Sequence, residues 1–202
     1  MLMRELAMDE CDVVAYLSRN GISYRREWGT GGAKKLGDLF AEQLSGLCTL
    51  SVHDGRLMRI MRMVSVECFS SDFREARDPE KIVMLRILHA RCATGVLRVS
   101  LLRGALPSFD ARIPRRLDSH KGMLEALGKS FGFEFCGREL RSIGYLGYKE
   151  HRLPSKTFPG LIDTMHCYQY RITSLPKRLF REEYAVAAQC GTTTFGWVLP
   201  GE

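Results

Sequence analysis

Hydrophobic residues recur in this chain with two different periods, and each period predicts one kind of element. Between residues 34 and 48, apolar side chains recur at helical steps of four, four and three residues. They are Leu36, Phe40, Leu44 and Leu47. This spacing predicts an amphipathic helix over about 34–48 that buries these four side chains along one stripe.

A second helix is predicted from Ser119 to about Ser130. Asp118 and Ser119 are residue types that cap helix N-termini, and the apolar positions through Leu127 recur at helical spacing. Gly132 follows the last turn, where glycine commonly ends a helix. These two segments are the principal helices that we expect.

Alternation with a period of two predicts the strands. In the clearest case, Leu97, Val99 and Leu101 alternate with Arg98 and Ser100. A short apolar run before the turn dipeptide Asn20-Gly21 is predicted as a first strand. The strand-like segments are Val13–Leu17, Leu57–Cys68, Lys81–Ala90, Gly95–Arg103, Leu140–Lys149, Leu161–Thr173 and Glu183–Thr194.

About eight strands with two helices predict an α+β fold, specifically a single antiparallel β-barrel. We expect one domain over residues 1–202. Residues 1–33 would supply the first strand and a flexible loop, and residues 34–194 the helices and strands of the barrel. The glycines at 29–32 are typical of a linker, because the lysine and hydroxyl residue that end a phosphate-binding loop are missing.

Three arginines lie in the predicted strands. Arg62 and Arg86 interrupt apolar runs, and Arg98 occupies the polar register of its strand. Two interpretations stay open: the guanidinium groups face solvent, or they point into a closed barrel, where each buried charge needs a partner. The strand pairing that would decide between them is not given by the sequence.

Charge adds a preference for acidic partners. The chain has 30 Lys and Arg against 23 Asp and Glu, a net charge of +7. This bias favours nucleic acid, anionic surfaces or acidic proteins. The basic residues are spread along the chain, which favours a solvated basic surface over direct nucleic-acid binding. We also expect neither a membrane span nor a secretory leader.

The cysteines predict a reducing compartment. The chain has seven of them, an odd number, and none forms a close metal-binding pair with another cysteine or a histidine. Most lie beside apolar residues, so we expect reduced and buried thiols. The nucleus or cytosol fits this pattern better than secretion.

Catalytic patterns are weak. His166 and Cys167 are neighbours on a predicted strand, so their side chains should point to opposite faces. No alternate-position carboxylate pairs occur on the predicted strands, although a hard divalent cation needs converging oxygens. We therefore expect no catalytic, cofactor-binding or metal-ligating residues, and no enzyme. The carboxylates considered are Glu67, Glu134, Glu139, Asp163, Glu182 and Glu183.

Four segments together resemble the subunit 18 family of the Mediator complex, the coactivator of RNA polymerase II. The first is a helix with a Leu-x-Gly-Leu-Cys pattern, the second a pair of strands, the third a helix followed by Gly-Phe and a strand, and the fourth a further strand. In this chain they are Leu36–Cys48, Ile82–Gly104, Met123–Tyr148 and Thr164–Ile172. The loop Leu153–Pro159 has no counterpart in the family pattern.

The resemblance implies a noncatalytic barrel related to the triphosphatase tunnel fold. It implies a nuclear protein that regulates transcription through protein–protein contacts. A second barrel, Mediator subunit 20, would pack beside it, and a helix of subunit 8 would tether it. The metal-binding Glu-x-Glu pairs of the triphosphatases are missing here, which agrees with the noncatalytic branch.

Two alternatives belong to other functional classes. The chain can be interpreted as a basic RNA-associated or organellar ribonucleoprotein component, in which exposed tyrosines stack on bases and arginines contact phosphates. A triphosphate hydrolase with an atypical site is the third interpretation. The tyrosines in question are Tyr145, Tyr148, Tyr168 and Tyr170.

Overall fold

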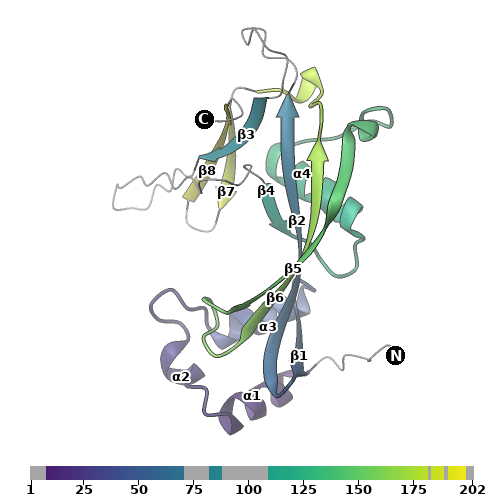
Figure 1. The fold of residues 1–202 in the computed structure, drawn as a ribbon. Coiled ribbons are helices and arrows are strands. Elements are labelled where there is room, and N and C mark those ends of the chain that lie inside the picture. Colours follow the sequence, from purple (N-terminus) through teal and green to yellow (C-terminus); the bar gives the residue numbers. More distant parts are fainter. Residues whose placement is uncertain (1–7, 71–81, 88–108, 182, 189–190, 199–202) are drawn as a thin grey trace, which may run out of the picture. The chain divides into compact units, whose positions relative to one another are not determined.

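The computed structural model describes residues 8–70, 82–87, 109–181, 183–188 and 191–198 (Figure 1). The helices are α1 (Glu10–Arg19), α2 (Tyr24–Glu27), α3 (Leu36–Leu44) and α4 (Ser119–Phe131), with 3₁₀ turns at Glu139–Ser142 and Lys177–Leu179. The strands are β1 (Thr49–His53), β2 (Arg56–Ser70), β3 (Ile82–Ile87), β4 (Phe109–Arg112), β5 (Ile143–Pro154), β6 (Ile162–Ile172), β7 (Glu183–Ala188) and β8 (Gly191–Val198).

The described strands form a sheet of order β5-β6-β2-β3-β8-β7, and β1 and β4 also pair with β2. Neighbours such as β1–β2 and β7–β8 are antiparallel. The fold class α+β is confirmed. The closed barrel of eight strands is not, because this order begins at β5 and ends at β7 without joining them among the described residues. Among the strands that the structure describes, β5 is therefore an edge strand, with β6 on one side.

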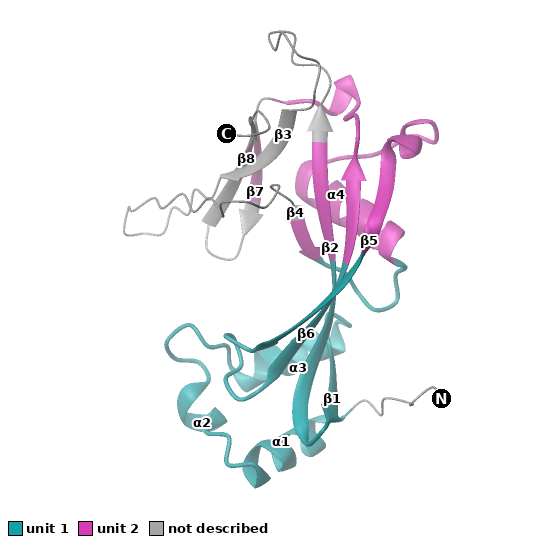
Figure 2. Ribbon diagram, viewed as in Figure 1, with its two compact units in different colours: residues 1–63, 112–118, 148–167 teal, residues 64–111, 119–147, 168–202 magenta. Residues whose placement is uncertain are grey.

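The chain divides into two compact units, each described here by itself (Figure 2). Unit 1 comprises residues 1–63, 112–118 and 148–167, and unit 2 comprises residues 64–111, 119–147 and 168–202. The strands β2, β5 and β6 contribute residues to both. The single domain expected over residues 1–202 stays a prediction.

The first predicted strand is wrong, because its residues form helix α1. Val13 and Leu17 are one helical turn apart, and both are fully buried. The Asp9 side chain accepts a hydrogen bond from the Asp12 backbone N–H at 2.8 Å and caps the N-terminus. A five-residue apolar run does not distinguish a strand from a buried helix turn, and the cap decides in favour of the helix.

Helix α3 confirms the first predicted helix, but its buried stripe differs from the predicted one. Leu39 is fully buried and Phe40 is 9% exposed, whereas Leu44 at the C-terminal end is 84% exposed. Leu36 is partly buried against the core of unit 1. The stripe therefore runs through Leu36, Leu39 and Phe40, and Leu44 was wrongly included in it.

The remaining predictions have mixed outcomes. α4, with Gly132 at φ +70° after it, confirms the second helix, and β2, β3, β5 and β6 confirm four of the predicted strands. The segment predicted as one strand over 183–194 is instead the antiparallel pair β7–β8. The strand predicted over 95–103 lies outside the described residues. β1, β4 and α2 were not predicted.

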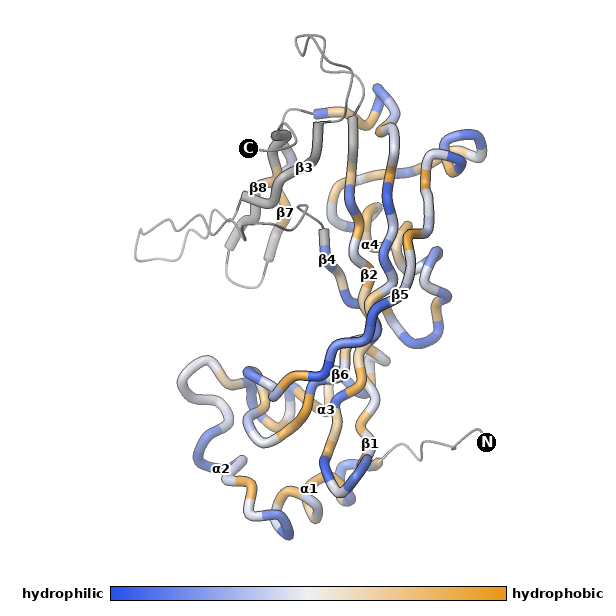
Figure 3. The backbone as a smooth tube through the Cα atoms, in the orientation of Figure 1, coloured by the Kyte–Doolittle hydropathy of each residue, from blue (hydrophilic) through white to orange (hydrophobic). Residues whose placement is uncertain are grey.

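Unit 1 buries its core between its helices and the inner face of its strands. Helix α1 supplies Val13 and Leu17, and Trp28 donates a hydrogen bond from its indole nitrogen to the Pro159 carbonyl at 3.0 Å. The other buried members are Tyr24, Leu39, Phe40, Cys48, Leu50, Leu57, Met61, Phe158 and Leu161. Part of β5 is coloured strongly hydrophilic in Figure 3, and the sequence of this strand includes Lys149, Glu150, His151 and Arg152.

Unit 2 has an aromatic core. Phe131 at the end of α4 stacks on Phe133 at 5.1 Å and meets Tyr184 edge-on at 5.6 Å. Burial raises the pKa of the Tyr184 hydroxyl to about 12, and burial also raises the pKa of the Cys68 thiol to about 12. Both groups are therefore neutral at physiological pH and act in packing.

Candidate functional site

The part of β5 that lies in unit 1 is exposed at every residue from Tyr148 to Pro154. Successive strand side chains point to opposite faces, so a strand that covers a core normally alternates between buried and exposed positions. Tyr148 and Leu153 are 45% and 53% exposed although both are large and apolar. An edge strand whose side chains are exposed on both faces offers its backbone edge as a template for another chain. We therefore take it as the candidate site.

The tyrosine of this segment is held in place by β6. The Tyr148 ring stacks on His166 with ring centroids 5.8 Å apart and planes at 27°, and its hydroxyl hydrogen-bonds to His166 Nδ1. Arg152 donates from Nε to Glu150 at 2.7 Å. This hydrogen bond and the Arg152 charge hold the pKa of Glu150 below its ordinary value. Glu150 and Arg152 therefore form a charged pair on this face.

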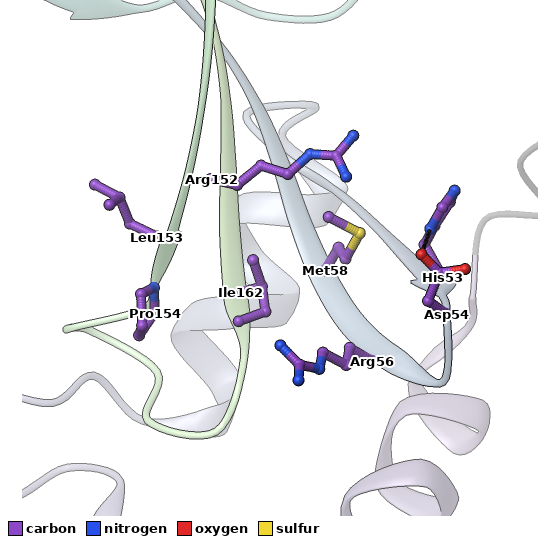
Figure 4. Close-up of a pocket in the computed structure, with 8 residues that line it drawn as sticks. All are labelled: His53, Asp54, Arg56, Met58, Arg152, Leu153, Pro154 and Ile162. Carbon is purple, nitrogen blue, oxygen red and sulfur yellow. Dashed lines mark ion pairs between the residues drawn. The ribbon is translucent and has the colours of Figure 1, made fainter.

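A cavity of about 460 Å³ lies in unit 1 between β5 and the β1–β2 hairpin (Figure 4). Arg56 and Arg152 supply positive charge, and the apolar part of the lining comes from strands β2, β5 and β6. Figure 4 shows Arg152 extending from β5 toward the hairpin that carries His53 and Asp54. The lining residues are His53, Asp54, Arg56, Met58, Arg152, Leu153, Pro154 and Ile162.

The β1–β2 hairpin that bounds this cavity turns at the dipeptide Asp54-Gly55. Asp54 has φ +51° and Gly55 φ +71°, the two positive values that a type I′ turn requires. The turn pairs His53 with Arg56 across β1 and β2. The Asp54 carboxylate lies 2.9 Å from His53 Nδ1. Asp-Gly between apolar runs was the sequence signal that would have identified β1.

Beneath the strands, a buried ion cluster is centred on Arg59, which is 2% exposed. Its Nε and Nη2 donate to the two oxygens of Asp163 at 2.9 and 2.8 Å, and its Nη1 donates to Glu42 at 3.1 Å. The guanidinium also lies over the Phe158 ring, 4.7 Å from its centroid. The two parallel hydrogen bonds to Asp163, together with the contacts to Glu42 and Phe158, offset the free-energy cost of removing the Arg59 charge from water.

Glu42 joins this cluster to two more cations. Its carboxylate lies 2.7 Å from Lys34 Nζ and 2.9 Å from Arg112 Nη1. Burial raises the pKa of Glu42, but the hydrogen bond from Lys34 and the charges and hydrogen bonds of the arginines outweigh it, so its pKa lies below the ordinary value. Burial, followed by the Glu42 charge, raises the pKa of the nearby Cys48 thiol to about 11. That thiol is therefore a poor nucleophile.

Three of the six carboxylates considered in the sequence are drawn into separate ion pairs, and the Glu134 side chain is exposed. Glu67 pairs with Arg171, Glu139 with Arg178, and Asp163 with Arg59. Within the described residues, 8–70, 82–87, 109–181, 183–188 and 191–198, no group of three or more potential ligands is placed to hold a metal ion. Glu182 lies outside the described residues, as does the side chain of Glu183.

Of the three arginines singled out in the predicted strands, the structure describes the side chain of one, Arg62. Arg62 donates to the backbone carbonyl of Arg115 at 3.1 Å and also to that of Leu117, so it is partly exposed and bonded to a loop. The side chain of Arg86 and all of Arg98 lie outside the described residues. The arginine that does point inward, Arg59, was missed, because its acceptors come from distant segments.

The four tyrosines considered for base stacking are not equivalent. Tyr145 and Tyr148 on β5 are 56% and 45% exposed. Tyr170 is 3% exposed, and its hydroxyl shares a hydrogen bond of 2.6 Å with the Ser119 hydroxyl. Tyr168 is only partly exposed. Two of the four therefore present a substantial surface.

Comparison with known proteins gives no assignment: neither the scan against protein-family models nor the search of curated proteins finds a match. Among the helices that the structure describes, none is both long and apolar enough to span a bilayer. The function is therefore argued from the site.

Proposed function

We propose that the chain is a noncatalytic subunit of a protein assembly and that it binds a partner protein along β5. The observation that carries this proposal is the run of exposed residues from Tyr148 to Pro154, which includes large apolar side chains. Exposed aromatic and aliphatic residues beside polar ones are typical of interface surfaces. In the part of the chain that the structure describes, β5 ends the strand order, so its outer edge adds backbone hydrogen-bonding groups for an incoming strand.

The assembly that we propose is the Mediator complex, on the resemblance to its subunit 18 family. The proposal includes the nuclear location, the role in transcription, and contacts with subunits 20 and 8. The α+β sheet is compatible with it.

The state of the acidic groups supports a noncatalytic role. A general acid or base must be free to exchange its proton near the operating pH. Glu42 is held by cations that lower its pKa, and the carboxylates of Glu67, Glu139 and Asp163 are each engaged by an arginine. Groups fixed in this way stabilise the structure and are poorly suited to proton transfer.

A nucleic-acid binder is the second candidate function, favoured by one observation. Tyr148 is exposed on the part of β5 in unit 1 that also carries Lys149 and Arg152, so base stacking and phosphate contacts would be available together. Against it, one face of the Tyr148 ring stacks on His166.

Titration of labelled single-stranded RNA and duplex DNA across a salt series separates the two functions. A protein subunit is expected to bind these oligonucleotides with affinities in the high-micromolar range or weaker, because its +7 charge provides only nonspecific attraction. Submicromolar affinity near physiological salt, with a steep salt dependence and no protein partner present, would favour the nucleic-acid binder.

A further inference from the structure

We propose that the cavity beside β5 binds a carboxylate of the partner, and that the partner segment is an acidic, extended stretch of protein paired with β5. This inference rests on the proposed function and specifies its partner. The cavity lies next to the exposed edge strand and shares Arg152, Leu153 and Pro154 with it. A strand laid along β5 would therefore bring alternate side chains close to the cavity.

The cavity holds guanidinium groups with unused donors. Arg56 makes no side-chain hydrogen bond or ion pair with the described residues, and Arg152 uses only Nε, toward Glu150. Guanidinium groups bind carboxylates through two parallel hydrogen bonds, which gives direction as well as strength. Arg56 is therefore available for an external carboxylate.

The acid within the cavity does not cancel this charge. Asp54 lies 2.9 Å from His53 Nδ1, and within the described residues it forms no ion pair with Arg56 or Arg152, so one carboxylate stands against two guanidinium groups in the lining. Met58 and Ile162 supply an apolar lining that fits the methylene stem of a glutamate. Partial burial among apolar groups strengthens an ion pair relative to one in open water.

The same lining argues for a protein segment over a nucleotide. Apart from the His53 imidazole, the residues around the cavity are aliphatic, polar or charged, and no Phe, Tyr or Trp is among them. Base recognition on single strands depends on aromatic faces. A glutamate side chain needs only a guanidinium and an apolar channel, and both are present.

Fluorescence anisotropy with the full chain tests this inference. The probe is a labelled peptide that alternates valine with glutamate, compared with the same peptide carrying glutamine in place of glutamate. We expect the acidic peptide to bind at least about tenfold more tightly, and Arg56→Gln to remove most of that difference. Arg26→Gln, a charge change at another exposed arginine of unit 1, is the matched control and should leave binding nearly unchanged.

Equal binding of the two peptides, or equal loss in Arg56→Gln and Arg26→Gln, would overturn the inference. Single-stranded RNA that displaces the acidic peptide and loses affinity in Arg56→Gln would also overturn it, in favour of a nucleic-acid site. Failure here is distinguishable from failure of the proposed function. If a partner copurifies with the chain and binds Arg56→Gln as tightly as the unchanged protein, the proposed function stands and the cavity is not the binding site of the carboxylate.

Discussion

Leu39→Ala is expected to lower the free energy of unfolding by about 2 to 5 kcal/mol, the usual range for a core leucine. Leu39 is fully buried on α3 within the core of unit 1. Leu44→Ala, on the same helix, is expected to change it by no more than about 0.5 kcal/mol, because Leu44 is 84% exposed. Urea unfolding followed by circular dichroism measures both values.

The pair of variants has matched chemistry, since each removes the same atoms from the same helix. Helix propensity favours alanine slightly at both sites, so it does not produce the difference. A large loss of stability in Leu44→Ala together with a small one in Leu39→Ala would contradict the orientation of α3. It would mean that Leu44 is buried, as the sequence spacing predicts, and that Leu39 is not.

Arg59→Met is expected to lower the free energy of unfolding by about 3 to 5 kcal/mol. The substitution leaves the Asp163 and Glu42 carboxylates, whose side chains are 14% and 9% exposed, without their shared guanidinium. Arg56→Met on the same strand is the control, because Arg56 is exposed and should cost no more than about 0.5 kcal/mol. Urea unfolding at neutral pH gives both numbers.

A double variant identifies the cause of this loss. Adding Asp163→Asn to Arg59→Met removes the stranded charge, so the double variant should be more stable than the sum of the two single losses implies. Strict additivity would mean that the Arg59–Asp163 pair does not interact in the folded protein, contrary to the bidentate geometry at 2.9 and 2.8 Å.

The long periodic elements could be predicted from the sequence because their patterns are local. Helix α4 and strands β2 and β6 are long enough to show several periods each. The short apolar run at Val13–Leu17 has too few periods, and the local signal that identifies α1 is its Asp9 cap. The local signal for β1 is the Asp54-Gly55 turn that follows it.

The ion cluster and the exposed strand could not be predicted in the same way. The carboxylates that balance the charge of Arg59 belong to Glu42 and Asp163, which lie 17 and 104 residues away along the chain. The exposure of β5 depends on which strand lies at the edge, and alternation within one segment does not contain that information. The cavity combines β1, β2, β5 and β6, so it exists only once the register is set.

Affinity purification of the tagged chain from nuclear extract, with every captured protein identified, tests the central claim most directly. We expect stoichiometric capture of protein subunits of a transcription assembly, a barrel subunit among them. We also expect that Leu153→Asp loses them while the exposed-site control Leu44→Asp retains them, because Leu153 is 53% exposed on β5 and Leu44 lies on α3. Capture of no stoichiometric protein partner, or equal capture by both variants, would contradict the claim.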